Sequence, residues 1–179
     1  NGSRNHDAAE AVAAEAREHG VDALVAMGNV GIKAEAEAVA KAGIDHFGRI
    51  DVLVNNAAIR PHGPFLDVSE DDWQQVMDVD LNAAIWLSRM ILPGMVANGW
   101  GRIISFSGMN AQRGYPGASA VSVAKHAVWG LTKAFAVEFG ANGITANIIA
   151  PGTFPAKDVD IATDAKFSAL LKTNPSGRH

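Results

Sequence analysis

Residues 101–152 read GRIISFSGMNAQRGYPGASAVSVAKHAVWGLTKAFAVEFGANGITANIIAPG. Within this stretch, residues 102–107 and 144–150 predict two buried strands, and residues 118–140 predict a long helix between them. Neither strand alternates cleanly between polar and apolar residues, which is typical of parallel strands that helices cover on both faces. The stretch therefore predicts a β-α-β unit of an α/β protein.

The residues before this unit continue the alternation of helices and strands. An alanine-rich amphipathic pattern predicts a helix that starts at Asn5 or Asp7 as its N-cap and ends near Gly20. Further strands are predicted at 21–27 and 51–55, and further helices at 32–47, at 69–95 with Pro93 as a candidate break, and at 161–172. The pattern predicts one α/β domain over residues 1–179, a three-layer, doubly wound parallel sheet of the Rossmann-like type that is present in part.

Composition narrows the class of protein. A chain of 179 residues with 48% hydrophobic residues buries one substantial core. The net charge of −4 comes without a basic cluster, so we expect no nucleic-acid partner. The absence of cysteine fits a reducing compartment, which makes the cytoplasm the expected location. All apolar runs are far shorter than the ~20 residues of a membrane span, so we expect no membrane partner.

Four short motifs stand in a fixed order along the chain. They are NNAA at 55–58 after a buried strand, GRII at 101–104, AKHA at 124–127 on a helix, and NIIAPG at 147–152. In this order they resemble the classical short-chain dehydrogenase/reductase family, over essentially the whole chain. The resemblance implies an NAD(P)-dependent oxidoreductase that acts on a carbonyl or alcohol of a small molecule.

The resemblance also implies that both ends of the domain are incomplete. The family carries a glycine-rich phosphate loop between its first strand and first helix, and residues 1–179 contain no such loop. Without that central strand, buried backbone groups would stay unpaired at a cost of about 1–3 kcal/mol each. We therefore expect a glycine-rich turn upstream of Asn1, and residues 174–178 resemble a loop that precedes a final helix and strand.

The resemblance assigns cofactor contacts to several segments. The backbone of Asn56, Ala57 and Ala58 is expected to line the adenosine ribose, although a plain strand-to-helix turn is the simpler interpretation. Asn29, with Val30, stands where the family often has an aspartate beside adenine, and its amide oxygen can accept from an exocyclic amine. Asn29 also suits an ordinary turn.

Two further segments concern the cofactor: residues 1–4 bear on the choice between NADP and NAD, and residues 151–154 on the binding of the nicotinamide. Residues 1–4 contain no carboxylate for a ribose diol, and Arg4 suits a 2′-phosphate, so NADP is slightly favoured over NAD. The alternative is that Arg4 is simply a solvated terminal residue. The resemblance places the nicotinamide carboxamide beside the backbone of Pro151, Gly152, Thr153 and Phe154, but Ala156 replaces a family threonine.

The catalytic positions depart most from the family. A tyrosine and a lysine four residues apart on one helix face normally act together, and Lys125 is in place. Counted from Lys125 and from Trp73, the family's tyrosine, serine and asparagine fall on Val121, Gly108 and Asp80. Val121 has no proton to give, so the resemblance leaves hydride transfer in doubt.

Other side chains are candidates to replace the missing catalytic groups. Tyr115 lies in a loop that rarely reproduces the geometry of a helix face, and Ser107, like Ser105, points away from the required face unless the strand end twists. Asp80 and Lys125 can pair as an acid–base couple or as a structural salt bridge, and we favour the structural pair because a buried lysine without a partner is costly. His126 points about 100° away from Lys125 on its helix, and His62 lies in a loop near the expected ligand.

Three functions therefore remain open. They are an NAD(P)-dependent oxidoreductase, a non-catalytic relative that binds a dinucleotide or a protein partner, and a different chemistry built on Asp80 and Lys125. In each case we expect Ala58, Lys125 and Pro151-Gly152 to meet in one cleft at the carboxyl ends of the strands. A homo-oligomer through the long helices is also expected, with Trp86, Met90, Trp129 and Phe135 as candidate contacts that suit an intramolecular core equally well.

Overall fold

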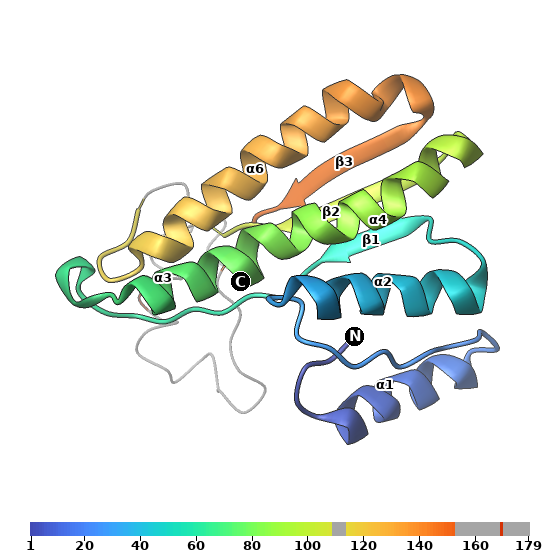
Figure 1. The fold of residues 1–179 in the computed structure, drawn as a ribbon, viewed down its shortest axis with the longest axis horizontal. Coiled ribbons are helices and arrows are strands. Elements are labelled where there is room, and N and C mark those ends of the chain that lie inside the picture. The colour runs from blue at the N-terminus through green and yellow to red at the C-terminus, as the bar shows by residue number, and fades with distance from the viewer. Residues whose placement is uncertain (109–113, 153–168, 170–179) are drawn as a thin grey trace.

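The computed structural model describes residues 1–108, 114–152 and 169, and shows a Rossmann-like α/β fold in part. Its sheet has three parallel strands in the order β1 (Val52–Asn55), β2 (Gly101–Phe106) and β3 (Ile144–Ile149) (Figure 1). β2 pairs with both neighbours, so the carboxyl ends of all three strands meet at one edge. The helix predicted at 161–172 and the loop at 174–178 lie outside the described residues.

Three helices form a layer against this sheet: α2 (Lys33–Phe47), α4 (Ala83–Asn98) and α6 (Ser119–Phe139) (Figure 1). The core between the layers is built from Met95, Ile103 and Ile144, each at most 1% exposed, together with Leu53, Ile91 and Leu92. Each large apolar side chain buried there contributes roughly 1.5–3 kcal/mol to folding.

The outer edge of the sheet is exposed among the described residues. β1 pairs there with β2 alone, and Val52 and Val54 are 46% and 50% exposed. On β3, Thr145 and Asn147 are exposed as well. The described helices of the main layer therefore cover one face of β1–β3, and the other face carries these exposed side chains.

The strand predicted at 21–27 was wrong for the described structure. Only Met27 forms a β-bridge, with Gly2, and Val21, Leu24 and Met27 are 37–56% exposed. A strand is stable only when a neighbour pairs along its length, and Gly2 provides a single pairing.

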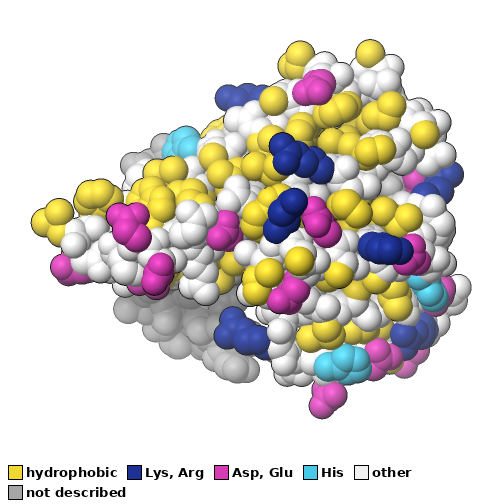
Figure 2. Space-filling view, viewed as in Figure 1, with side chains coloured by type: hydrophobic (Ala, Val, Ile, Leu, Met, Phe, Trp, Pro, Cys, Tyr) yellow, Lys and Arg dark blue, Asp and Glu magenta, His cyan; other side chains and the backbone are white. Residues whose placement is uncertain are grey.

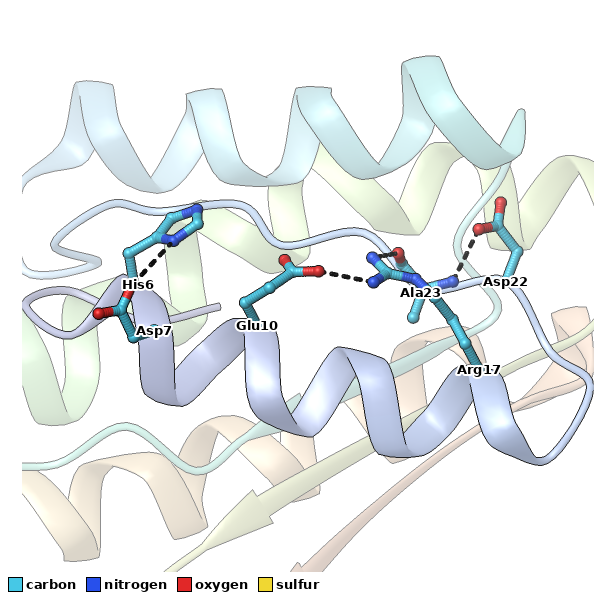
Figure 3. A network of polar contacts seen from close by, with 6 residues as sticks. All are labelled: His6, Asp7, Glu10, Arg17, Asp22 and Ala23. Carbon is cyan, nitrogen blue, oxygen red and sulfur yellow. Dashed lines mark hydrogen bonds and ion pairs between the residues drawn. The ribbon is translucent and has the colours of Figure 1, made fainter.

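Polar contacts hold this segment to the preceding helix, α1 (His6–Glu18), instead (Figure 3). Of the two predicted candidates, Asn5 rather than Asp7 is the N-cap of α1, and its side chain accepts from the Ala8 amide. Arg17 donates to Glu10 and to the Ala23 carbonyl, both at 2.6 Å. These contacts are exposed, so water and salt screen them and they add little to stability.

The helix predicted at 69–95 is interrupted at a different place from Pro93. It consists of α3 (Glu70–Met77), a π-helical turn η2 (Asp78–Asn82) and α4. α4 continues through Pro93 to Asn98, because the buried Leu92 and Met95 beside Pro93 hold it against the core. The shorter helical turns are η1 (Phe65–Asp67) and η3 (Gly140–Asn142). In the described part of the chain, no helix has the length and apolar character needed to cross a membrane.

Candidate functional site

The segment that follows β1 forms the floor of the candidate site. Asn55 ends the strand and donates through Nδ2 to the Ser105 hydroxyl on β2, at 3.3 Å. Its Oδ1 atom is buried and has no hydrogen-bond partner among the described residues. A buried amide oxygen without a donor is costly, so Asn55 offers an acceptor to a ligand that donates there. Asn56 and Ala57, which follow, are exposed.

The π-helical turn η2 points one carboxylate towards this segment. Asp80 is 4% exposed, and its Oδ1 accepts from the Ile59 amide at 2.8 Å. A π turn inserts an extra residue into a helix and shifts the direction of the side chains around it, and such turns are frequent at functional sites. Neither the turn nor the contact with Ile59 is predictable from a residue pattern in this segment.

Lys125 reaches Asp80 from the neighbouring helix α6. Its Nζ atom lies 3.3 Å from Asp80 Oδ2, and the two side chains are 8% and 0% exposed. Oδ2 has no hydrogen bond in good geometry, so the contact is an ion pair rather than a directed hydrogen bond. The structure therefore brings together the two residues that the sequence analysis paired.

The surroundings of Asp80 raise the pKa of its carboxyl above the usual range. Burial, which disfavours the charged form, is the largest cause. The positive charge of Lys125, the hydrogen bond from the Ile59 amide, the direct polar contact of the Lys125 ammonium with the carboxylate and the charge of Arg60 act in the opposite direction and only partly offset it. The positive charge of Lys125 is therefore the main influence that stabilises the ionised form of the Asp80 carboxyl.

Asp80 and Lys125 line a cavity of about 380 Å³ together with Asn55, Asn56 and Ala57. This cavity extends along the open edge of β1 as far as Ile50, so part of it is an uncovered strand edge. A second cavity of about 440 Å³ adjoins it, because Val30, Ala57 and Val79 line both. The residues that the two cavities share include Ala57, just after the carboxyl end of β1, where open α/β sheets bind ligands.

The second cavity contains the residues assigned to the adenosine half of a cofactor. It is lined by Ser3, Arg4, Asn29, Val30 and Ala58. Arg4 is exposed, and Val30 is 7% exposed in a small core cluster with Ala36 and Ala83. The Oδ1 atom of Asn29 already accepts from the Gly31 amide at 3.0 Å, so Asn29 has the turn-forming role as well as its place in the cavity.

Val121 does not line the cavity that Lys125 lines. It lines a separate cavity of about 190 Å³ with His62, Asp72 and Ser119, and packs against Val76 and Ala120. A methyl group on Gly108 would meet nothing within 4 Å, so there is open space at that position. The replaced tyrosine and serine positions therefore contribute no hydrogen-bond donor from a side chain.

The other candidate side chains, Ser107, Tyr115 and His126, differ in burial and in their contacts. Ser107 is 6% exposed, and its hydroxyl is buried without a partner among the described residues, on the same strand face as Ser105. Tyr115 is 51% exposed and stacks edge-on against His62 at 5.8 Å between ring centroids. His126 is exposed and contacts the Ser122 carbonyl through Nδ1, on its own helix.

The remaining cofactor segment is described only in part. Pro151 and Gly152 follow β3, whose carboxyl end lies at the same edge as those of β1 and β2. Thr153, Phe154 and Ala156 lie outside the described residues.

Comparison with known proteins agrees with this arrangement. The profile of the short chain dehydrogenase family matches residues 2–165. The chain belongs to the short-chain dehydrogenase family. An uncharacterized oxidoreductase, YohF, of Escherichia coli K12 is 36% identical over 174 residues, which cover 94% of this chain and 69% of that protein. A 3-oxoacyl-[acyl-carrier-protein] reductase of Synechocystis is 36% identical over the whole chain and 71% of its own length.

Solved structures of the short-chain dehydrogenase family share the fold. The crystal structure of a gluconate 5-dehydrogenase from Burkholderia cenocepacia in complex with NADP and tartrate matches 99% of this chain and 70% of its own, with a TM-score of 0.84 and 31% identity. The chain spans about seven tenths of the length of these relatives.

Proposed function

We propose that this short-chain dehydrogenase family member binds NAD(P) along the carboxyl ends of its strands, and that its hydride transfer to a small-molecule carbonyl is impaired. One observation carries the proposal: Lys125 and the segment 55–57 line a cavity that adjoins the one lined by Arg4 and Asn29. Two adjoining cavities suit an extended ligand such as a dinucleotide, which consists of two linked nucleotides.

The residues present fit such a ligand. The small side chains of Ala57 and Ala58 would permit close approach of a sugar to the backbone, and the buried ammonium of Lys125 would donate to ribose hydroxyls. The unpaired Oδ1 of Asn55 accepts from a hydroxyl or an amide. Pro151 to Phe154 are proposed to hold the nicotinamide carboxamide. A bound nicotinamide supplies the hydride.

NADP is favoured over NAD. Ser3 and Arg4 line the adenosine cavity, and residues 1–4 contain no carboxylate that would repel a 2′-phosphate. Guanidinium groups bind phosphate with charge-assisted hydrogen bonds. The related gluconate 5-dehydrogenase was solved in complex with NADP, which supports a nicotinamide dinucleotide as the ligand.

The chain lacks the group that would move a proton at the substrate oxygen. Val121 and Gly108 provide neither a phenol nor a hydroxyl, and a positioned proton donor contributes about 10²–10⁴-fold to such reactions. We therefore expect turnover of small carbonyl compounds to be slow.

A second candidate function uses Asp80 and Lys125 as an acid–base couple. The observation that favours it is their contact at 3.3 Å in the wall of a cavity, with the pKa of Asp80 raised towards the range useful for proton transfer. Such a couple would act on a proton of a bound molecule without a phenol.

We also propose that copies of this protein associate into a homo-oligomer through the long helices. Trp86, Met90 and Phe135 pack against the core of the same chain. Val123 and Val137 on α6 are instead 48% and 87% exposed, so they are better candidates for contact with a second copy. Figure 2 shows hydrophobic side chains over the region where Figure 1 places α4 and α6.

Titration of the full-length protein with NADPH and NADH tests the proposal, together with Arg4→Ala and the matched control Lys133→Ala, a change of an exposed cation on α6. We expect NADPH to bind more tightly than NADH. Arg4→Ala is expected to weaken NADPH binding by roughly 10-fold, the effect of one hydrogen bond to a charged group, and to leave NADH unchanged.

Reduction of a panel of small carbonyl compounds is measured alongside. Slow turnover with clear NADPH binding supports the proposal. Binding without turnover identifies a non-catalytic relative, and ordinary enzyme rates would contradict the impaired site. A protein that binds neither nucleotide has a different function.

A further inference from the structure

The carboxylate of Asp80 is fixed on one side and paired on the other. Its Oδ1 atom is held by the Ile59 amide at 2.8 Å, so the carboxylate cannot follow Lys125 if the lysine moves. Its Oδ2 atom has only the ammonium of Lys125, at 3.3 Å and without a directed hydrogen bond. Lys125 is thus free to redirect its donors, while Asp80 stays in place.

A dinucleotide in the proposed cavity competes for the same ammonium. Lys125 and Asp80 line one wall of it, so ribose hydroxyls that accept from Lys125 draw the ammonium away from Asp80. Loss of that ammonium penalises an ionised carboxylate at this buried position and does not penalise a protonated one.

On the proposed function of dinucleotide binding, we propose that Asp80 is a positioning residue that couples binding of the dinucleotide to uptake of one proton by its carboxyl group. The protonated carboxyl leaves Lys125 unpaired and ready for the ligand. The ionised carboxylate holds Lys125 and opposes the ligand. Affinity therefore rises as the pH falls through the range in which Asp80 titrates.

The charges that act on Asp80 come from two elements. Lys125 faces it from α6, and Arg60 acts on it from the segment after β1. On its own turn, Asp78 is engaged with Gln74 and Asn82. The acidic residues of α3 lie in the exposed first turn of that helix, and Arg89 of α4 is exposed.

Calorimetric titration with NAD⁺ from pH 5 to 8 tests the coupling. NAD⁺ is the probe because it lacks the 2′-phosphate, which itself titrates near pH 6. Full-length wild-type protein is compared with Asp80→Asn, which keeps an acceptor for the Ile59 amide and removes the titrating group. Asp78→Asn is the matched control on the same turn.

We expect wild-type protein and Asp78→Asn to bind NAD⁺ at least about fivefold more tightly at pH 5 than at pH 8, with proton uptake on binding. Asp80→Asn is expected to lose this dependence and to bind at pH 8 with the affinity of wild-type protein at low pH. By reciprocity, bound NAD⁺ must raise the pKa of the Asp80 carboxyl in a ¹³C NMR titration of wild-type protein, a readout that holds even if the variant fails to fold.

The outcomes separate this inference from the proposed function. NAD⁺ binding whose pH dependence is the same in wild-type protein and Asp80→Asn, or an Asp80 pKa that bound NAD⁺ leaves unchanged or lowers, would overturn the coupling alone. Failure of wild-type protein to bind NAD⁺, NADPH or NADH at any pH would overturn both.

Discussion

Val121 and Lys125 lie one helical turn apart on α6, yet they line different cavities. Residues at i and i+4 share a helix face, and the family tyrosine reaches from that face towards the substrate. The valine is too short to do so and joins an apolar cluster with Val76 and Ala120. The loss of the phenol thus changes the packing as well as the chemistry at this position.

Restoring the two missing groups tests this view of the residue. In the full-length protein, Val121→Tyr with Gly108→Ser returns a phenol and a hydroxyl to the positions where the family carries them. We expect carbonyl reduction with NADPH to rise at least ~10²-fold, the low end of what a positioned proton donor contributes. Gly108 has open space around it, and the cavity of about 190 Å³ beside Val121 has room for part of a ring.

The control for this double variant is Val121→Phe with Gly108→Ser, which adds the ring without its hydroxyl group and should leave the rate unchanged. Unfolding is measured alongside, because a larger side chain at a packed position costs about 1–3 kcal/mol. A well-folded Tyr variant that binds NADPH and reduces nothing would show that the site has diverged beyond these two side chains.

At the scale of elements, most helices and strands of the central unit follow from the sequence. The predicted strands at 102–107 and 144–150 and the helix at 118–140 match β2, β3 and α6 to within a residue or two. The sequence features that predict these elements are local: apolar runs, a long apolar helix and glycines at the ends. The strand at 21–27 failed because pairing with a neighbour is not written in the segment itself.

The candidate site was predictable only in part for the same reason. The pairing of Asp80 with Lys125 followed from counting along two helices, but its geometry depends on the π turn η2 and on the Ile59 amide. A π turn has no clear residue pattern, and contacts between a loop and a helix depend on tertiary packing. Asn55 was quoted in a motif, but its unpaired oxygen appears only once Ser105 is placed beside it.

The turn between η3 and β3 gives a prediction at this scale. Gly143 has φ +75°, and a methyl group there would lie 2.1 Å from the Gly99 carbonyl oxygen. Gly143→Ala should therefore destabilise the protein by roughly 2–4 kcal/mol in urea unfolding, from the left-handed backbone and the clash together. The matched control Gly94→Ala lies inside α4 with nothing within 4 Å, and should stabilise by about 0.5–1 kcal/mol. Equal effects of the two changes would contradict the close approach of these loops.

At the scale of the whole molecule, the outer face of α6 decides how copies of the chain meet. Val123 and Val137 are fourteen residues apart, which is close to four helical turns, so they lie on one side of α6. Gly130 and Ala134 lie between them, and all four are exposed. Small side chains allow a second helix to approach closely, and the two valines supply apolar area on either side.

Charges placed on this face of α6 should separate the copies. Val123→Asp with Val137→Asp places a charge at both ends of it, and burying an unpaired charge in an interface is costly. We expect the full-length protein to sediment as an oligomer and the double variant to shift to the monomer, with NADPH binding retained because neither valine lines the cavities of about 380 and 440 Å³. The control is Val12→Asp, which charges an exposed valine (67%) on α1 and should leave the oligomer intact. A monomeric wild-type protein, or an oligomer that survives both aspartates, would show that α6 does not form the interface.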